Sequence, residues 1–139
     1  MPPSRLPGYV EHLGIVEREL GPGWVRCELL VSETHQNIQG VIHGSVAFAL
    51  LDTAMGHALT SLLSPGEFCS TTQISVQFLK ASFPGDCLVA TGKVSRRGNR
   101  IGYLEGVCVN QAGDEIARAH GTWYIGRADR PPGAAPAAP

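Results

Sequence analysis

The stretch of this chain that decides its fold reads HGSVAFALLD, from His43 to Asp52. His43 and Gly44 open it, mostly apolar residues follow, and the carboxylate of Asp52 closes it. An ionised carboxylate that is taken away from water loses several kcal/mol of solvation, so an acid is rarely placed there without need. We therefore expect Asp52 to be a functional carboxylate; the alternative is a structural Asp whose oxygens are satisfied by hydrogen bonds.

Residues 45–63 are predicted to form one long amphipathic helix. A Ser64-Pro65-Gly66 segment follows and is expected to end it. At 1.5 Å per residue the helix is about 27 Å long, enough to cross a whole sheet. A narrow polar line on one side holds Ser45, Asp52, Gly56 and Thr60. The expected apolar face consists of Ala47, Phe48, Leu51, Ala54, Met55, Ala58, Leu59 and Leu62.

The rest of the chain has mostly strand patterns. Leu13–Leu20 and Trp24–Val31 flank a Gly21-Pro22-Gly23 turn and are predicted to form a hairpin. Short connections between successive strands favour antiparallel meander pairing. The sequence thus predicts an α+β fold, with an antiparallel sheet of five to six strands wrapped around one central helix. The further strands are expected at residues 68–83, 87–94, 101–109 and 116–125.

Length and charge suggest one domain without nucleic-acid or membrane partners. The chain has 139 residues, and 11 Lys and Arg balance 12 Asp and Glu. No apolar run reaches membrane-spanning length, and the first residues have no signal-peptide core, so we expect a cytoplasmic protein. The expected division is a flexible N-terminus (1–8), one domain (9–127) and a disordered Pro/Ala-rich tail (128–139).

The four cysteines, Cys27, Cys69, Cys87 and Cys108, are widely spaced. They form no CxxC pair and no Cys/His ligand spacing, so reduced thiols are expected and no metal site.

The start of the helix has the chemistry of an oxyanion site. Backbone N–H groups in a first helical turn lack internal partners, and the helix dipole adds partial positive charge there. Gly44 has no Cβ, so a ligand oxygen can approach its N–H closely. The Asn37 side-chain amide offers a second donor. The alternative is that Gly44 eases a tight turn and Asn37 satisfies loop backbone.

Gly44 and Asp52 are too far apart to act on one carbonyl within one chain. Eight residues of helix separate them by about 12 Å, whereas a base or nucleophile must lie about 3 Å from its target. Two copies with antiparallel helices would bring Gly44 of one beside Asp52 of the other. The spacing therefore predicts a dimer with shared sites, unless the two residues do unrelated jobs.

This constellation resembles the hot-dog-fold acyl-CoA thioesterases of the phenylacetate-pathway (PaaI-like) branch, over about residues 10–126. The family usually has His-Gly-Gly at the helix entrance, whereas Ser45 occupies the second glycine position here. This leaves the Gly44 N–H in place and is expected to crowd the substrate's path. The residues that carry the resemblance are Asn37, Gly40 to Ser45, Leu51, Asp52, Thr71, Thr72, Val76, Phe78 and Leu79.

The resemblance implies a role for each matching residue. Asp52 would be the nucleophile or general base, and the Gly44 N–H, helped by Asn37, would polarise the thioester carbonyl. His43 would orient the loop or contact the thioester region. Thr71 would position the attacking water or the carboxylate. Among further substrate contacts, Ser45 borders the substrate's path and Thr72 is a weaker candidate for the same region as Thr71.

The same resemblance implies coenzyme A as part of the substrate, no metal or organic cofactor, and a homodimer that often pairs into a homotetramer. Coenzyme A carries phosphates, so basic groups near the site are expected. Lys80 is one candidate, and Arg96, Arg97 and Arg100 around the Gly98 turn are others. The alternative for these is an ordinary charged surface at a hairpin.

Several readings remain open at this stage. Hydrolysis of an acyl- or aryl-CoA thioester is the leading one. A hot-dog hydratase or dehydratase acting on enoyl or 3-hydroxyacyl thioesters is a second, and a non-catalytic acyl-CoA-binding module is a third. The acyl group is not selected by composition or spacing. Trp24, Trp123 and Tyr124 are expected to pack the sheet or an interface, with an acyl-pocket wall as the alternative.

Overall fold

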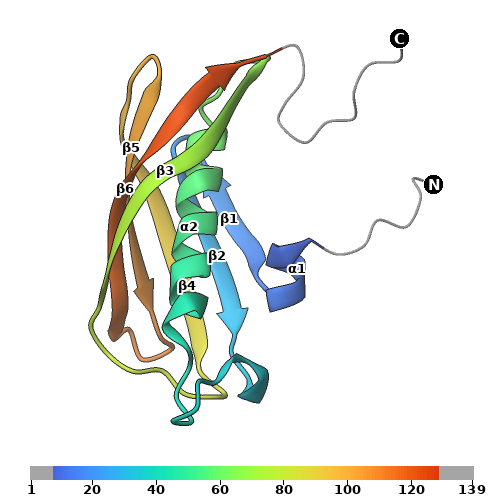
Figure 1. Cartoon of the computed structure of the whole chain (residues 1–139), viewed down its shortest axis with the longest axis vertical. Helices are drawn as coiled ribbons and strands as arrows, with labels where there is room; N and C mark the ends of the chain where they lie inside the picture. Colours follow the sequence, from blue (N-terminus) through green and yellow to red (C-terminus); the bar gives the residue numbers. More distant parts are fainter. Residues whose placement is uncertain (1–7, 129–139) are drawn as a thin grey trace, which may run out of the picture.

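A computed structural model describes residues 8–128 of the chain. One long helix lies across the concave face of a strongly curved sheet, and a short helix sits beside it (Figure 1). In chain order the elements are α1 (Tyr9–Leu13), β1 (Val16–Gly21), β2 (Trp24–Leu30), a 3-10 turn η1 (Glu33–His35), α2 (Gly44–Thr60), β3 (Glu67–Phe78), β4 (Cys87–Arg97), β5 (Ile101–Val109) and β6 (Glu115–Arg127).

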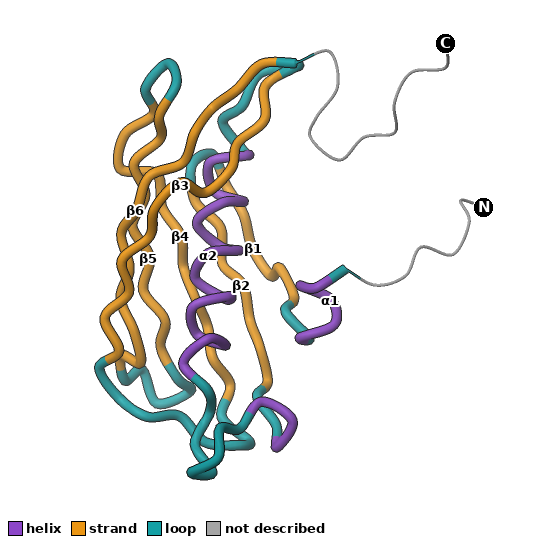
Figure 2. Tube along the Cα trace, viewed as in Figure 1, coloured by secondary structure: helices purple, strands orange, loops and turns teal. Residues whose placement is uncertain are grey.

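The sheet has six strands in the order β1-β2-β4-β5-β6-β3, and every neighbouring pair is antiparallel. The tube view shows β3 and β6 running together along one side while β1 forms the other edge (Figure 2). This confirms the predicted α+β class and the upper figure of the five to six strands expected. Both edge strands keep one row of backbone groups without a neighbour in the described part of this single chain.

Helix α2 approaches the sheet closely because small residues line the contact. A Cβ built on Gly92 of β4 would lie 2.5 Å from the backbone of Ala54, and one on Gly106 of β5 would lie 2.9 Å from the Met55 sulfur. Neither position has room for a side chain, so glycine there allows the helix to pack directly on the strands. Leu50, Leu51, Ala54, Met55, Ala58 and Leu59 are fully buried against this surface.

The boundaries of both helices differ from the expectation. Leu13 was expected to start the first strand, but it ends α1, because Gly14 adopts φ 94° and reverses the chain before Val16. The long helix covers Gly44–Thr60 rather than 45–63. Its apolar face is largely as predicted, except that Phe48 is 37% exposed and Leu62 falls beyond the helix.

The predicted meander is wrong for one strand. β3 and β4 follow each other in the chain but do not pair; β3 instead pairs with β6, and β2 with β4. The segment after Phe78, expected to continue the strand to residue 83, is a loop that leads from one edge of the sheet to its middle. Of the expected termini, residues 1–7 and 129–139 lie outside the described residues, so the flexibility predicted for them stays a prediction.

Candidate active site

Asp52, in the middle of α2, is held by a hydroxyl from the edge strand. Thr71 Oγ1 donates a hydrogen bond of 2.8 Å to Asp52 Oδ1. Asp52 is half-buried, while Thr71 is exposed on β3 and stands opposite Trp123 of β6. The bond fixes one carboxylate oxygen and leaves the other without a hydrogen-bond partner among the described residues. The structure therefore brings together these two residues, which the sequence analysis assigned to one region.

Thr72 does not belong to this cluster. The pairing of β3 with β6 shifts between Thr71 and Gln73, so Thr72 is the extra residue of a β-bulge. Its hydroxyl bonds to Thr122, donating to the carbonyl at 2.9 Å and lying 2.8 Å from the side-chain oxygen. Thr122 alternates with the buried Trp123, so this pair lies on the outer face of the sheet. The expectation that Thr72 shares the Asp52 region is therefore wrong within one chain, because adjacent residues of a strand point to opposite faces of the sheet.

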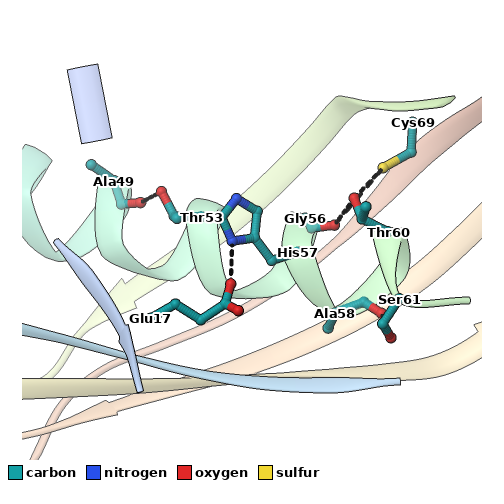
Figure 3. A network of polar contacts seen from close by, with 9 residues as sticks. All are labelled: Glu17, Ala49, Thr53, Gly56, His57, Ala58, Thr60, Ser61 and Cys69. Atoms are coloured by element: carbon teal, nitrogen blue, oxygen red, sulfur yellow. Dashed lines mark hydrogen bonds and ion pairs between the residues drawn. The ribbon is translucent and has the colours of Figure 1, made fainter. Parts of the chain in front are cut away.

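A small cavity of about 260 Å³ opens beside Asp52 and Thr71. The cavity extends along α2 from Asp52 past Gly56 to Thr60, towards the C-terminal end of the helix. Thr60 Oγ1 donates to the Gly56 carbonyl at 2.9 Å and lies 3.6 Å from the sulfur of Cys69 (Figure 3). The sequence analysis did not assign this cavity, although the alignment of Gly56 and Thr60 with Asp52 on one helix line was its signal. Its lining consists of Val10, Asp52, Thr53, Gly56, His57, Thr60, Cys69, Ser70, Thr71 and Trp123.

The start of α2 is held by its own loop. His43 is the N-cap, and its Nδ1 accepts a 3.0 Å hydrogen bond from the Ser45 N–H. Because Nδ1 accepts, the neutral ring carries its proton on Nε2, which is left as a donor at the helix entrance. Gly44 is the first helical residue, so its N–H has no partner inside the helix. Gly44, His43 and Ser45 are all exposed.

Asn37 organises the loop that precedes this entrance. Its side-chain oxygen accepts hydrogen bonds from the N–H of Gln39 at 2.8 Å and of Val41 at 3.3 Å. This is the loop role that the sequence analysis kept as an alternative. It occupies the oxygen only, so the amide N–H₂ keeps its capacity to donate to a ligand.

A second cavity, of about 300 Å³, lies at the helix entrance. The Phe78 ring forms one wall and approaches Gly44 so closely that a Cβ built there would lie 3.3 Å from it. Lys80 also lines this cavity, with its ammonium 2.6 Å from Asp114 Oδ2. Lys80 is thus placed beside the entrance, as its suggested role requires, and is partly neutralised by a neighbour.

The other basic candidates lie at the opposite end of the sheet. Arg97 ends β4 and Gly98 lies in the turn between β4 and β5, whereas Lys80 lies in the loop between β3 and β4, at the other end of the molecule (Figure 1). Arg97 forms an ion pair with Glu67, whose side chain is only 1% exposed. Arg100 is exposed, and its carbonyl accepts a bond from the Ile125 N–H. Arg97 therefore holds the end of the sheet together, and within one chain none of this turn lies near Gly44.

Charge and thiol chemistry elsewhere have structural causes. The Ser64 N–H, followed by the Arg97 guanidinium, lowers the pKa of Glu67 below its ordinary 4.5. Burial raises the pKa of Cys27 to about 11 and that of Cys108 to about 12, so both thiols stay protonated at neutral pH. All four cysteines are free in the structure, two of them buried and two half-buried.

The described residues 8–128 contain no group of three His, Cys, Asp or Glu side chains arranged to hold a metal ion. In the same part of the chain, no helix combines the length and apolarity needed to cross a membrane.

Comparison with known proteins identifies the fold and family. The model of the thioesterase superfamily matches residues 39–117, more than half of the chain. The chain is 32% identical, over 82% of its length and 72% of the relative's, to an Archaeoglobus fulgidus protein that carries an esterase name. It is also 29% identical to human acyl-coenzyme A thioesterase 13, over 76% of this chain and 75% of the relative.

A solved structure agrees with these sequence matches. The Escherichia coli PaaI protein from the phenylacetic acid degradation operon superposes with a TM-score of 0.78 at 28% identity, covering 83% of this chain and 81% of that one. These matches confirm the resemblance on which the sequence analysis relied. The chain belongs to the thioesterase superfamily, with the hot-dog fold of its PaaI-like members.

Proposed function

We propose that this protein hydrolyses acyl- or aryl-CoA thioesters to a free carboxylic acid and CoA, with Asp52 as the reacting carboxylate. The observation that supports this most is the 2.8 Å bond from Thr71 to Asp52 at the mouth of a cavity. A carboxylate that is fixed through one oxygen and open at the other is oriented to attack a carbonyl carbon or to take a proton from water.

Two routes use this geometry. In the first, Asp52 attacks the thioester carbon, CoA leaves as a thiolate, and water cleaves the resulting anhydride. In the second, Asp52 removes a proton from a water molecule that attacks the same carbon. In both routes the carbonyl oxygen gains negative charge, which the Gly44 N–H stabilises with help from the Asn37 amide and the His43 Nε2–H.

Donor and carboxylate meet only if two copies of the chain come together. Gly44 and Asp52 lie four residues on either side of Phe48, which is 37% exposed although it is a large apolar residue. A two-fold axis at the level of Phe48 places Gly44 of one protomer beside Asp52 of its partner. The exposed ring then lies in the interface, where burying it stabilises the dimer.

The edge strand gives the same position for the axis. Gly44 faces Phe78 and Asp52 bonds to Thr71, so the midpoint of the two contacts on β3 falls between Ile74 and Ser75. Pairing of β3 with its symmetry copy around that midpoint continues the sheet through the dimer and satisfies its open edge. Two independent elements therefore support one interface.

The coenzyme end of the substrate is assigned to the helix entrance, where Lys80 borders the cavity next to Gly44. A thioesterase of Streptococcus pneumoniae whose structure includes coenzyme A shares the fold, with a TM-score of 0.75 at 26% identity. Arg96 and Arg100 stay candidates for phosphate contacts from the partner protomer. Arg97 is a weaker one, because Glu67 holds it. Pairing of dimers into a tetramer, a place in phenylacetate degradation and a cytoplasmic location also stay predictions.

The test is thiol release from a panel of aryl and aliphatic CoA esters, combined with light scattering to measure the oligomer. Release of CoA by a dimer or tetramer is expected. Hydration of crotonyl-CoA without thiol release would favour the hydratase alternative, and tight binding of CoA esters without turnover would favour the binding module. A protein that is monomeric and fully active would overturn the shared site.

A further inference from the structure

The loop that precedes α2 is joined to the rest of the protein by few hydrogen bonds. This entrance loop comprises residues 32–43, from the start of η1 to the N-cap of α2. Among the described residues, two hydrogen bonds connect it to segments other than α2. The Ile42 N–H donates to the Ser82 carbonyl at 2.9 Å, and the His35 ring bonds to the Leu13 carbonyl at 3.0 Å. Only the second is made by a side chain, so a substitution can remove it.

The His35 ring is a bridge with a defined arrangement of protons. Its Nδ1 accepts a 2.9 Å hydrogen bond from the Ser32 N–H. Because Nδ1 accepts, the neutral ring carries its proton on Nε2 and donates it to the Leu13 carbonyl, which can only accept. The ring is half-buried. Both ring nitrogens therefore hold segments of the chain together.

The far end of the bridge is anchored in α1. Leu13 is the last residue of this helix, where carbonyl groups lack partners inside the helix. Val10 and Leu13 pack against the hydrophobic core, so α1 gives the loop a fixed point of attachment.

The near end of the bridge leads to the proposed oxyanion donors. The His35 carbonyl accepts a 2.9 Å hydrogen bond from the His43 N–H, and Gly44 follows His43 directly. Asn37 lies two residues beyond His35. A displacement of His35 therefore moves the Asn37 amide, the His43 ring and the Gly44 N–H. Donors of this kind act at about 3 Å from the developing charge, and a misplacement of about 1 Å can cost about 10²-fold in rate.

We propose that His35 is a positioning residue for the thioesterase reaction, whose ring joins the entrance loop to α1 and thereby holds the oxyanion donors in place. This rests on the proposed function and adds to it a residue that acts through Gly44 and Asn37 without touching the substrate. A bond that only stabilised α1 would instead lower Tm and leave kcat unchanged.

Three substitutions separate the two nitrogens of the ring. His35→Phe keeps the ring but removes both hydrogen bonds. His35→Asn keeps an acceptor near the position of Nδ1 and does not reach Leu13, whereas His35→Gln extends an amide N–H to the position of Nε2. In His35→Phe and His35→Asn, kcat should fall by about 10- to 100-fold with little change in KM, because the donors act on charge that develops in the transition state. His35→Gln should recover most of the kcat.

Two controls distinguish this loss from a loss of stability. Glu67→Gln, at the other end of the sheet, should lower Tm without changing kcat. His120→Phe, on the exposed outer face of β6, should change neither. Hydrogen exchange gives a readout that does not depend on activity: the amides of residues 36–44 should exchange faster in His35→Phe and at nearly the wild-type rate in His35→Gln.

The Gly44 N–H gives a readout that a structural role would not change. In a Gly44→Pro background this donor is already absent, so His35→Phe should add a much smaller loss than it causes in the wild-type protein. In a Gly44→Ala background the donor is present, and His35→Phe should cause its full loss.

The outcomes separate the two proposals, with thiol release measured on benzoyl-, phenylacetyl-, hexanoyl- and decanoyl-CoA. A wild-type kcat in His35→Phe, or a loss that multiplies fully with that of Gly44→Pro, would overturn the positioning role and leave the thioesterase function standing. Equal losses in His35→Gln and His35→Phe would overturn the assignment to the Leu13 bond. Absence of thiol release from every ester by the wild-type protein would overturn the proposed function and the role of His35 with it.

Discussion

The first turn of α2 and its middle lie on one helix but are built in different ways. The first turn offers a backbone N–H at Gly44, and local contacts of its own loop hold it in place. The middle offers the carboxylate of Asp52, and a hydroxyl 19 residues further along the chain orients it. The first turn therefore depends on backbone conformation, whereas the middle depends on the packing of an edge strand. Neither half is a complete site, so the mechanism that we propose requires two copies of the chain.

The largest effect is expected from the middle of the helix. Asp52→Asn retains the shape and the Thr71 contact but removes the charge, and it should lower kcat by about 10²–10⁴. Thiol-release kinetics measure this loss, and thermal unfolding checks that the fold persists. The matched control is Glu105→Gln on the exposed outer face of β5, which should keep wild-type activity. Near-normal turnover by Asp52→Asn would remove Asp52 from the chemistry.

The second-largest loss of activity is expected from a change in the first turn of α2. Gly44→Pro deletes the N–H, yet proline suits the first position of a helix, and His43 already has the extended φ −60°, ψ 136° that must precede proline. Loss of one oxyanion donor should cost about 10²–10³ in kcat. Gly44→Ala adds the same Cβ near Phe78 but keeps the N–H, and it should lose much less. Equal losses in both variants would mean that crowding, not the donor, matters.

Mixing the Asp52→Asn and Gly44→Pro variants tests directly whether the two residues of one site come from different protomers. A dimer of one Asp52→Asn chain and one Gly44→Pro chain keeps one intact site. An equimolar mixture should therefore recover about a quarter of the wild-type rate after subunit exchange, since half of the dimers are mixed and each has one working site of two. No recovery in a mixture shown to exchange would place both residues in the same protomer's site.

A smaller effect is expected from the loss of the hydrogen bond by which Thr71 orients Asp52 in the middle of α2. Thr71→Val keeps the shape of the side chain and removes the hydroxyl that donates to Asp52. A bond to a charged group of this kind corresponds to about a tenfold loss in kcat. Thr72→Val is the control, because Thr72 bonds to Thr122 on the other face and should not affect kcat. The reverse ranking of these two variants would mean that the bulge is placed differently.

The smallest effect on activity is expected from substitution of Glu67 at the end of the sheet, because this residue has only a structural role. Its folded pKa lies below 4.5, so the ionised carboxylate stabilises the fold at neutral pH, and that contribution is lost as the pH falls below this value. Glu67→Gln should lower Tm at pH 7, with the difference shrinking towards pH 3, while kcat stays unchanged. A Tm difference that is constant across this range would exclude the ionised pair as its cause.

Much of this architecture follows from local patterns. The 3.6-residue period of α2, the alternation of Trp24–Leu30 and the turn glycines are properties of neighbouring residues, so they predict the elements without knowledge of the rest. The same holds for Gly44 and Asp52, because a glycine at a helix start and an acid on an apolar helix stand out in any context. Phe48 is the exception on the helix: periodicity places it on the apolar face, but it is 37% exposed in the single chain.

Contacts between distant residues could not be read in this way. Alternation along a strand places Thr71 and Thr72 on opposite faces, but only the register of β3 against β6, in which Thr71 stands opposite the buried Trp123, decides which of the two faces Asp52. The ion pair of Arg97 with Glu67, which makes Arg97 a weaker candidate for a phosphate contact, likewise joins residues 30 positions apart.

The sequence by itself therefore determined most of the elements, the fold class and the choice of Gly44 and Asp52 as candidate reactive positions, because short-range periodicity and the cost of burying charge act within a few residues. Only the tertiary structure decided which hydroxyl orients Asp52, that β3 pairs with β6, and that His35 joins the entrance loop to α1. These contacts depend on the order and register of the strands. Order and register are set by interactions between side chains that lie tens of residues apart in the sequence.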